Sequence, residues 1–349
     1  MAVLSTQVPT TSTVRITNVP PGGWDDALLF PTLGSAFARA ARVLGQRALY
    51  ATDGVSRALI LTRALPAPFV RWWTTRAKIY VETDSTTFVP AVVDAVRAQG
   101  VSYVRLGDAV WGLPAVARTV PGMRSITTHL VTFDGTTPDD AALARMESKT
   151  RAHLRKAQRE GVVVTEVRDA GGIDEFCRLF DETSERMRAR AISAAAPTEY
   201  FRAVFREMVP RGEAIFLIAR LEAQALAGGL FLVSPTRMSY YLGASTRDRT
   251  LTARHGPTAV FWRAMQLARE LEIPRFDLGA VTPTDDASHP HHSVYQFKRG
   301  FGGRLEELHG GEVVLSPLKC GFQNHVVLPA WKHLYPWYLW LAALRAVTP

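Results

Sequence analysis

The stretch that decides the fold reads AIFLIAR at residues 214–220, ALAGGLFLV at 225–233 and MSYYLG at 238–243. Each segment is short and apolar, and polar turns separate the three, which predicts three successive strands of a meander. A helical pattern follows at 258–271 and a further strand at 275–278. Strands that lead into a helix and another strand indicate a mixed sheet covered by helices.

The predicted elements on either side of these strands extend the pattern. Upstream of them come a long helix, a strand and two more helices, and downstream comes a hairpin of two strands. In chain order these elements are 141–160, 162–167, 173–190, 197–208, 304–309 and 311–315. The order of strand, two helices, three strands, helix, strand and hairpin is typical of a GNAT-like N-acyltransferase core.

The chain before residue 141 predicts a further mixed α/β unit. With 349 residues the chain is long for one domain and of ordinary length for two. The segments that read as strands are 14–19, 47–51, 57–64, 78–82, 102–106 and 127–132, and those that read as helices are 32–44 and 89–98.

The composition narrows the kinds of partner and compartment. Hydrophobic residues make up 47% of the chain and the net charge is +9, which indicates a folded protein that favours polyanionic partners. The two cysteines, Cys177 and Cys320, provide neither a disulfide framework nor a zinc-binding spacing. The sequence shows no secretory signal and no apolar run of spanning length, so we expect a cytoplasmic protein without a transmembrane segment.

Several segments between residues 148 and 315 resemble, in order and spacing, the Fem (FemABX) family of peptidoglycan interpeptide-bridge aminoacyltransferases. The same layout occurs in a broader set of FemAB-like acetyltransferases. The matching segments are TRAHLRKAQREG at 150–161, EYF at 199–201, ALAGG at 225–229 with YYLGAS at 240–245, GP at 256–257 before Trp262, RFDLG at 275–279 and FKRGFGG at 297–303.

The resemblance implies an α/β (α+β) fold with tandem GNAT-like domains, each a mixed central sheet flanked by helices. The first domain is expected at 1–145, joined by a C-terminal helix within 320–349, and the second, which carries the matching segments, at 146–319. The chain lacks the long helical hairpin that some members insert, so it would be a short form of the family.

The match is weaker in the first domain, where the family binds its precursor. The family often has a Gln-Ser pair followed by an aromatic residue and a lysine, whereas this chain reads GSAF at 34–37 with Arg39 and Arg42. Asp108 corresponds to an aspartate of the family, and Ala196 stands where a basic residue is common. The resemblance therefore makes Arg39, Arg42 and Asp108 candidates for substrate binding.

The resemblance also selects the catalytic candidates. Lys298 would stabilise the negative charge of the tetrahedral intermediate, and Phe297 would exclude water; the alternative is a solvated lysine in a glycine-rich turn. Alternation along a strand places Tyr240 and Tyr241 on opposite faces, and we favour Tyr241 as the residue that lines the site. Tyr200 is a further candidate for substrate binding.

Basic residues are spaced along one predicted helix. Arg151, Arg155 and Arg159 are four residues apart and share a face, with Lys156 beside them. Such a face can neutralise the phosphates of tRNA or of a precursor diphosphate, although most charged helix faces are simply solvated.

Three further features bear on cofactors and membranes. The sequence HPHH at 289–292 lacks an acidic partner at a recognised ligand spacing, so we expect no metal. The segment ARHGPT at 253–258 departs from the glycine-rich loop that binds the CoA pyrophosphate, because Pro257 has no N–H. Residues 329–346 predict a helix with Trp331, Trp337 and Trp340, which would pack on the first domain or touch a membrane surface.

Three functions follow from these features. The first is an aminoacyltransferase that moves an amino acid from aminoacyl-tRNA, without a cofactor, to the stem-peptide amine of a nucleotide-linked or lipid-linked muramyl peptide. That activity would serve cell-wall cross-bridge formation and cell shape, in the cytoplasm or at the inner face of the membrane. The second is an N-acyltransferase that uses acyl-CoA on a polysaccharide or lipid amine. The third is a non-catalytic protein that binds tRNA or cell-wall precursor. The sequence does not identify the transferred amino acid, the number transferred or the oligomeric state.

Overall fold

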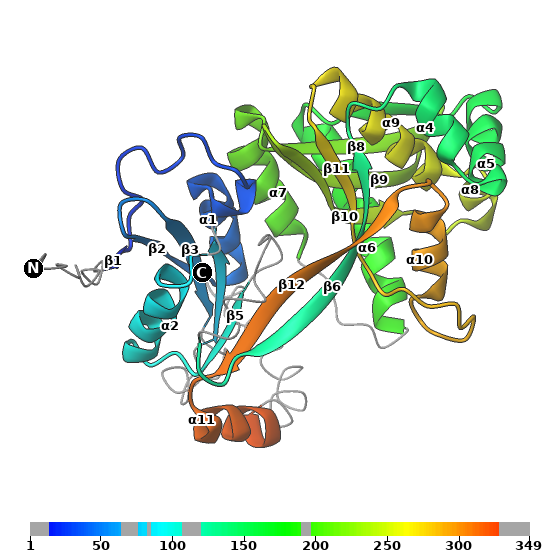
Figure 1. Cartoon of the computed structure of the whole chain (residues 1–349). Helices are drawn as coiled ribbons and strands as arrows, with labels where there is room; N and C mark the ends of the chain where they lie inside the picture. Colours follow the sequence, from blue (N-terminus) through cyan, green and yellow to red (C-terminus); the bar gives the residue numbers. More distant parts are fainter. Residues whose placement is uncertain (1–13, 64–75, 82–84, 107–119, 190–196, 328–349) are drawn as a thin grey trace, which may run out of the picture. The chain divides into compact units, whose positions relative to one another are not determined.

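The computed structural model describes residues 14–63, 76–81, 85–106, 120–189 and 197–327. Contacts between Cα atoms divide the chain into two compact units. The first comprises 1–21, 48–126 and 310–349, and the second comprises 22–47 and 127–309. Each unit is built from segments that are distant in sequence, as the colours of Figure 1 show. The predicted helix within 329–346 lies outside the described residues.

The described part of the first unit is a sheet with a long helix packed against it. Helix α2 (Phe88–Ala98) buries Phe88, Val92 and Val96 against the strands, because its apolar residues recur at helical spacing. This helix connects β4 (Arg76–Val81) to β5 (Tyr103–Leu106), and the two strands pair in parallel. The strand order is β1 (Arg15–Thr17), β2 (Arg47–Thr52), β3 (Arg57–Arg63), β4 (Arg76–Val81), β5 (Tyr103–Leu106) and the end of β12 (Arg304–Val314), and α11 (Pro317–Phe322) follows.

The second unit contains the meander that the sequence predicts. Neighbouring strands pair antiparallel except β10 and β11, which are parallel and are connected through helix α9 (Gly256–Glu270). The strand order is β6 (Arg124–Asp134), β11 (Arg275–Val281), β10 (Arg237–Ser245), β9 (Gln224–Ser234), β8 (Ala214–Leu221) and β7 (Val163–Glu166).

Helices cover both faces of this sheet. A Cβ atom added to Gly228 would lie 2.7 Å from Phe176 of α6, whereas one added to Gly229 would lie 3.0 Å from Val260 of α9. Because successive residues of a strand point to opposite faces, α6 and α9 lie on opposite sides of β9. The other helices are α1 (Ser35–Ala41), α4 (Asp139–Arg145), α5 (Ser148–Arg159), α6 (Ala170–Ala189), α7 (Thr198–Met208), α8 (Arg249–Thr252) and α10 (His292–Arg299).

The two units therefore repeat one motif, a strand, a helix and a parallel strand: β4–α2–β5 in the first and β10–α9–β11 in the second. The remaining strand pairs that flank each motif are antiparallel. The prediction of an α/β fold with mixed sheets flanked by helices is confirmed. The division at residue 145 stays a prediction, and the segment 22–47 groups with the second unit.

Two predicted elements were wrong in detail. The long helix at 141–160 is two helices, because Met146 and Glu147 are extended and the Glu147 N–H donates to the Gly300 carbonyl at 2.9 Å. The predicted hairpin is the single strand β12, which continues through Gly310 and Gly311. A Cβ atom on Gly311 would lie 2.5 Å from Met123 Sδ, so this glycine permits a close approach rather than a turn.

Candidate functional site

The parallel strands β10 and β11 separate soon after they meet. They pair only at Met238 with Phe276 and at Ser239 with Asp277. Immediately beyond, the register of each strand with its other neighbour shifts, between Tyr240 and Leu242 in β10 and between Asp277 and Ala280 in β11. Such bulges bend strands apart, and ligand sites in α/β sheets lie at the carboxyl ends of parallel strands.

A pocket of about 360 Å³ opens at this point; we name it the Lys298 pocket. It is formed by the end of β10, the first turns of α9 and helix α10, with one glycine of β9. The residues that line it are Gly228, Tyr240, Gly243, Ala244, Ser245, Pro257, Val260, Phe261, Ser293, Val294, Phe297 and Lys298. Its wall is mainly apolar, with a few hydroxyl groups, and the described residues contribute no carboxylate to it.

Lys298 is the one cation in that lining, and it is buried, with 6% of its surface exposed. Its Nζ donates to the Ala280 carbonyl at 2.9 Å and lies 5.2 Å from the centre of the Tyr240 ring. Burial lowers the pKa of Lys298 to about 8, while the charge of Asp277 acts in the opposite direction. A lysine with such a pKa can hold or release a proton near neutral pH.

Aromatic rings form the wall around this ammonium group. Phe297 packs edge-on against Phe261 with ring centres 5.5 Å apart, and Phe261 lies 4.7 Å from Tyr240. Burial also raises the pKa of the Tyr240 hydroxyl. A Cβ atom on Gly243 would overlap that hydroxyl, so the glycine makes room for the tyrosine. The predicted pair Lys298 and Phe297 therefore lies in one pocket with Tyr240.

Asp277 is fully engaged in hydrogen bonds. Its Oδ2 accepts from Arg237 Nε at 2.7 Å and from Ser239 Oγ at 2.6 Å, and its Oδ1 accepts from the Gly279 N–H at 2.9 Å. A carboxylate that accepts from three donors is held in one orientation.

The two other predicted tyrosines lie together, away from the lining of this pocket. Tyr200 is 2% exposed and its hydroxyl donates to the Tyr241 hydroxyl at 3.2 Å, while Tyr241 is 37% exposed. The bulge in β10 lies at Tyr241, because Tyr240 pairs with Phe231 and Leu242 with Leu230, which leaves Tyr241 as the extra residue of the strand.

The predicted substrate residues of the first helix have different surroundings. Arg39 in α1 donates to Glu207 of α7 at 2.6 Å, so its charge joins two helices. Arg42 is exposed at the end of the same segment. Asp108 and Ala196 lie outside the described residues.

The basic face of α5 is only partly available to a ligand. Arg151 donates to the carbonyls of Leu143 and Met146, so it caps the end of α4. Arg155 and Arg159 are exposed, and Lys156 is partly buried.

A histidine pair that the sequence analysis missed lies beside this face. His153 of α5 stacks on His255, the N-cap of α9, with ring centres 3.9 Å apart. Burial lowers the pKa of both imidazoles. The two histidines are distant in sequence, and only the packing of α5 on α9 brings them together.

The start of α9 is where a CoA-binding loop would lie. Pro257 has no N–H, and the N–H groups of Thr258 and Ala259 donate to the His255 carbonyl at 3.0 and 3.2 Å. These groups are therefore engaged within the turn. The first turn of α9 does not offer the run of free N–H groups that cradles a pyrophosphate.

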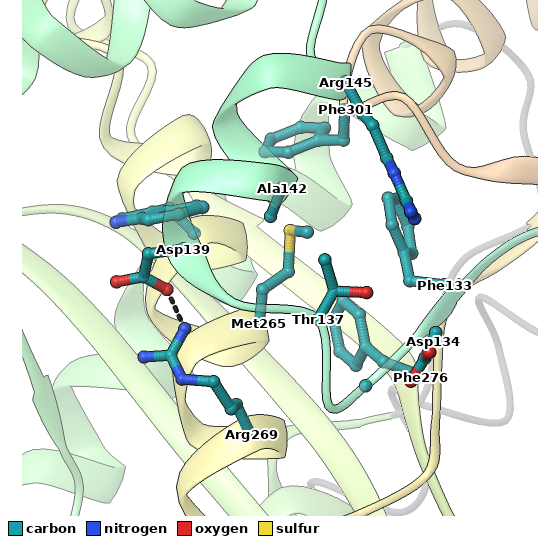
Figure 2. Close-up of a pocket in the computed structure, with 12 residues that line it drawn as sticks. Phe133, Asp134, Thr137, Asp139, Ala142, Arg145, Met265, Arg269, Phe276 and Phe301 are labelled. Atoms are coloured by element: carbon teal, nitrogen blue, oxygen red, sulfur yellow. Dashed lines mark hydrogen bonds and ion pairs between the residues drawn. The ribbon is translucent and has the colours of Figure 1, made fainter.

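Two other cavities lie in the same unit. The larger, of about 970 Å³, is bounded by the end of α7, the start of β8 and the end of β9, and we name it the α7–β8 cavity. Figure 2 shows a small one of about 20 Å³ among Met265, Phe276 and Phe301, beside an ion pair of Asp139 with Arg269. A space of that size holds about one water molecule and is a packing gap.

Among the described residues, no group of three His, Cys, Asp or Glu side chains is placed to hold a metal ion. In the same residues, no helix has the length and apolar character needed to cross a membrane. Cys177 and Cys320 are both buried and unpaired.

Comparison with known proteins places this site in a recognised domain. Residues 144–299 match the family described as acetyltransferase (GNAT) domain. Comparison with curated protein sequences finds no significant match.

Solved structures share the fold. The crystal structure of FemX superposes with a TM-score of 0.65 and 16% identity, over 83% of this chain and 93% of that one. The C-terminal domain of a putative lysylphosphatidylglycerol synthetase from Agrobacterium fabrum gives 0.52 and 16%, over 83% and 92%. L-PGS from Bacillus licheniformis gives 0.51 and 13%, over 76% and 83%.

These findings confirm two predictions. The chain has the fold of FemX, within the GNAT-like architecture. Residues 144–299, which contain the Lys298 pocket, form an acyltransferase domain of the GNAT type, and the protein is an acyltransferase.

Proposed function

We propose that this acyltransferase moves an aminoacyl group from aminoacyl-tRNA to an amine of a peptidoglycan precursor, with the Lys298 pocket as its catalytic centre. The observation that carries the proposal is a buried lysine that no carboxylate neutralises within the described residues. Among the described residues, Lys298 Nζ donates to the Ala280 carbonyl and lies over the ring of Tyr240. A buried, unneutralised cation at the carboxyl end of a strand is suited to an oxyanion that appears during reaction.

The chemistry is aminolysis of an ester. The neutral amine of the acceptor attacks the ester carbonyl carbon, a C–N bond forms, and the carbonyl oxygen becomes an oxyanion. The bond between the acyl carbon and the ribose oxygen then breaks. The ribose oxygen leaves as a hydroxyl group, with the proton that the attacking amine releases. The Lys298 ammonium would stabilise the oxyanion, and the ring of Phe297 would exclude the water that hydrolyses the ester.

The surroundings of the pocket favour tRNA over CoA as the donor. The engaged N–H groups at the start of α9 argue against a pyrophosphate cradle there. The exposed Arg155 and Arg159 of α5, a helix that packs on α9, are available to phosphates. Among the described residues the lining contains no carboxylate, so it offers no counter-ion to a cationic side chain on the transferred amino acid and favours an uncharged side chain.

The alternative of an acyl-CoA donor is supported by one finding, the match of residues 144–299 to a family described by acetyl transfer. Both functions use the same pocket and the same attack of an amine on an activated carbonyl, and they differ in the group that leaves, a ribose hydroxyl or a thiol.

The deciding experiment offers both donors in parallel. Purified protein receives either a pool of tRNA charged with labelled amino acids or labelled acetyl-CoA, each with a muramyl pentapeptide precursor in nucleotide-linked and lipid-linked form. Label on the precursor from tRNA alone supports the proposal and identifies the amino acid. Label from acetyl-CoA alone would refute it in favour of the alternative.

A further inference from the structure

Behind the Lys298 pocket, one buried carboxylate connects the two bulged strands, β10 and β11. Asp277 is 1% exposed and accepts from the side chains of Arg237 and Ser239 on β10 and from the backbone of Gly279 on its own strand. It does not line the pocket. Its contacts are thus with the segments that shape the pocket rather than with a ligand.

The bond to Gly279 fixes an unusual backbone. Gly279 has φ of +69°, in the left-handed region, and lies where the register of β11 with β6 shifts. A Cβ atom there would lie 2.7 Å from the Tyr240 carbonyl oxygen, so a side chain is excluded. The Asp277 carboxylate spans this bulge by binding the N–H two residues further along the chain.

The bulge determines where the next carbonyl points. Ala280 follows Gly279, and its oxygen is the acceptor for Lys298 Nζ at 2.9 Å. The chain of contacts therefore runs from Asp277 through the Gly279 N–H to the Ala280 carbonyl and the lysine. The negative charge of Asp277 also favours the ammonium form of Lys298 against the effect of burial.

We propose that Asp277 is the positioning residue of the acyl-transfer site: it fixes the Leu278–Gly279 bulge, which directs the Ala280 carbonyl at the Lys298 ammonium group. This inference rests on the proposed role of Lys298. The charged groups around Asp277 are Arg237 of β10, which is paired with it, Lys298 of α10, and Arg275 of β11, which is paired with Glu306 at 2.7 Å. Of these three cations, Lys298 alone lines the Lys298 pocket.

The test measures the lysine directly. Intact protein is treated with a trace of acetic anhydride at a series of pH values, and acetylation of Lys298 is quantified by mass spectrometry to give its titration. In Asp277→Asn we expect the titration of Lys298 to move to lower pH, because the favourable charge is lost. We also expect transfer activity at pH 7.5 to fall by about tenfold to 100-fold, because the ammonium group is displaced.

Two further variants separate charge from geometry. Gly279→Ala keeps the carboxylate and disrupts the bulge, so transfer activity should fall, and circular dichroism of the variant separates this loss from unfolding. Ser239→Ala removes one of three donors and should shift both readouts in the same direction by less, which provides a test if Asp277→Asn does not fold. The matched control is Ser234→Ala, on the same hairpin, whose hydroxyl bonds to the Arg237 backbone and not to Asp277; it should leave both readouts unchanged.

An unchanged Lys298 titration in Asp277→Asn and Ser239→Ala would overturn the inference, even if activity fell, because the loss would then be a general effect on stability. The labelling needs neither donor nor acceptor. A protein that shows the shift but transfers nothing from tRNA would therefore contradict the proposed function and leave the positioning role intact.

Discussion

The two ends of helix α9 border very different cavities. The Lys298 pocket, near its start, measures about 360 Å³, and the α7–β8 cavity, which Leu271 and Ile273 border just past its end, measures about 970 Å³. The larger cavity contains three arginines, each paired with a carboxylate: Arg168 with Glu166 at 3.1 Å, Arg206 with Glu207 at 3.1 Å and Arg211 with Glu213 at 2.9 Å.

The smaller pocket has one cation, Lys298, which is more deeply buried and has no carboxylate partner among the described residues. Burying an unneutralised charge costs free energy, so a buried lysine without a carboxylate partner indicates a functional use for its charge. The candidate site is therefore identified by a buried cation without a carboxylate partner rather than by the volume of its cavity.

The largest expected effect comes from removing the cation that distinguishes the two cavities. Lys298→Met should lower kcat/KM for transfer by about 100- to 1,000-fold, as expected when one group that stabilises an oxyanion is lost. The measurement is the initial rate of precursor labelling with charged tRNA. The matched variant is Arg206→Met in the α7–β8 cavity, which should keep a rate close to that of the unmodified protein; equal losses in the two variants would remove the distinction.

The same pair of variants should differ in stability. Because burial lowers the pKa of Lys298 from its ordinary 10.5 to about 8, Lys298→Met should stabilise the fold at pH 7 by as much as about 3 kcal/mol, at 1.36 kcal/mol per pKa unit. Arg206→Met, which loses an exposed ion pair, should change stability by less than about 1 kcal/mol.

The sign of the pH dependence follows from the depressed pKa. Between pH 8 and 10.5 the unfolded chain binds more protons at Lys298 than the folded protein does, so the cost of burying the lysine fades as the pH rises through this range. Urea unfolding at pH 7 and pH 10 should therefore show a smaller gap between the protein and Lys298→Met at pH 10. A gap that is the same at both values would contradict the depressed pKa.

A smaller effect should come from the shape of the Lys298 pocket. In Gly243→Ala the new methyl group overlaps the Tyr240 hydroxyl, and overpacking of this kind costs about 1–3 kcal/mol. We expect a rate loss of roughly tenfold, measured as kcat. Adding Tyr240→Phe to this variant removes the overlapping hydroxyl oxygen and should restore part of the rate. If the rate loss of the double variant equals the combined losses of the two single variants, the two residues are independent and the explanation by overlap is wrong.

The smallest effect is expected outside both cavities, on α5. Arg155→Glu with Arg159→Glu should raise KM for charged tRNA several-fold and weaken its dependence on salt, because each exposed arginine contributes one phosphate contact at most. The kcat value should change little. Arg151→Gln should instead lower the melting temperature, since Arg151 caps α4. If substitution of each of the three arginines raised KM alone by a similar factor, the distinction between one structural and two binding arginines would be wrong.

The sequence was sufficient for the order of most elements and for the choice of Lys298 as the catalytic candidate. Strands with strong apolar patterns, such as 214–220 and 225–233, fold nearly as predicted as β8 and β9, because local propensity and burial agree there. Lys298 and Phe297 were predicted through a resemblance in their segment, and the structure adds the burial and the contacts that make the lysine unusual.

The surroundings of the other candidate residues depend on local features that a sequence pattern cannot show. Alternation placed Tyr240 and Tyr241 on opposite faces without choosing between them, and in the structure Tyr240 lies against Lys298 while Tyr241 is the extra residue of the β10 bulge. Arginines such as Arg151 and Arg39 are typical of binding surfaces. In the structure, Arg151 caps the end of α4, and Arg39 joins α1 to α7 through Glu207. The pair of His153 and His255 depends on the packing of two helices that are distant in sequence.

The central claim is that the Lys298 pocket binds the reactive end of the donor. The most direct measurement is a crystal structure with an aminoacyl-adenosine analogue in which an amide replaces the ester. We expect the acyl carbonyl oxygen to lie within about 3.5 Å of Lys298 Nζ, the distance of a group poised to react. An analogue bound in the α7–β8 cavity, with the Lys298 pocket unoccupied, would contradict it.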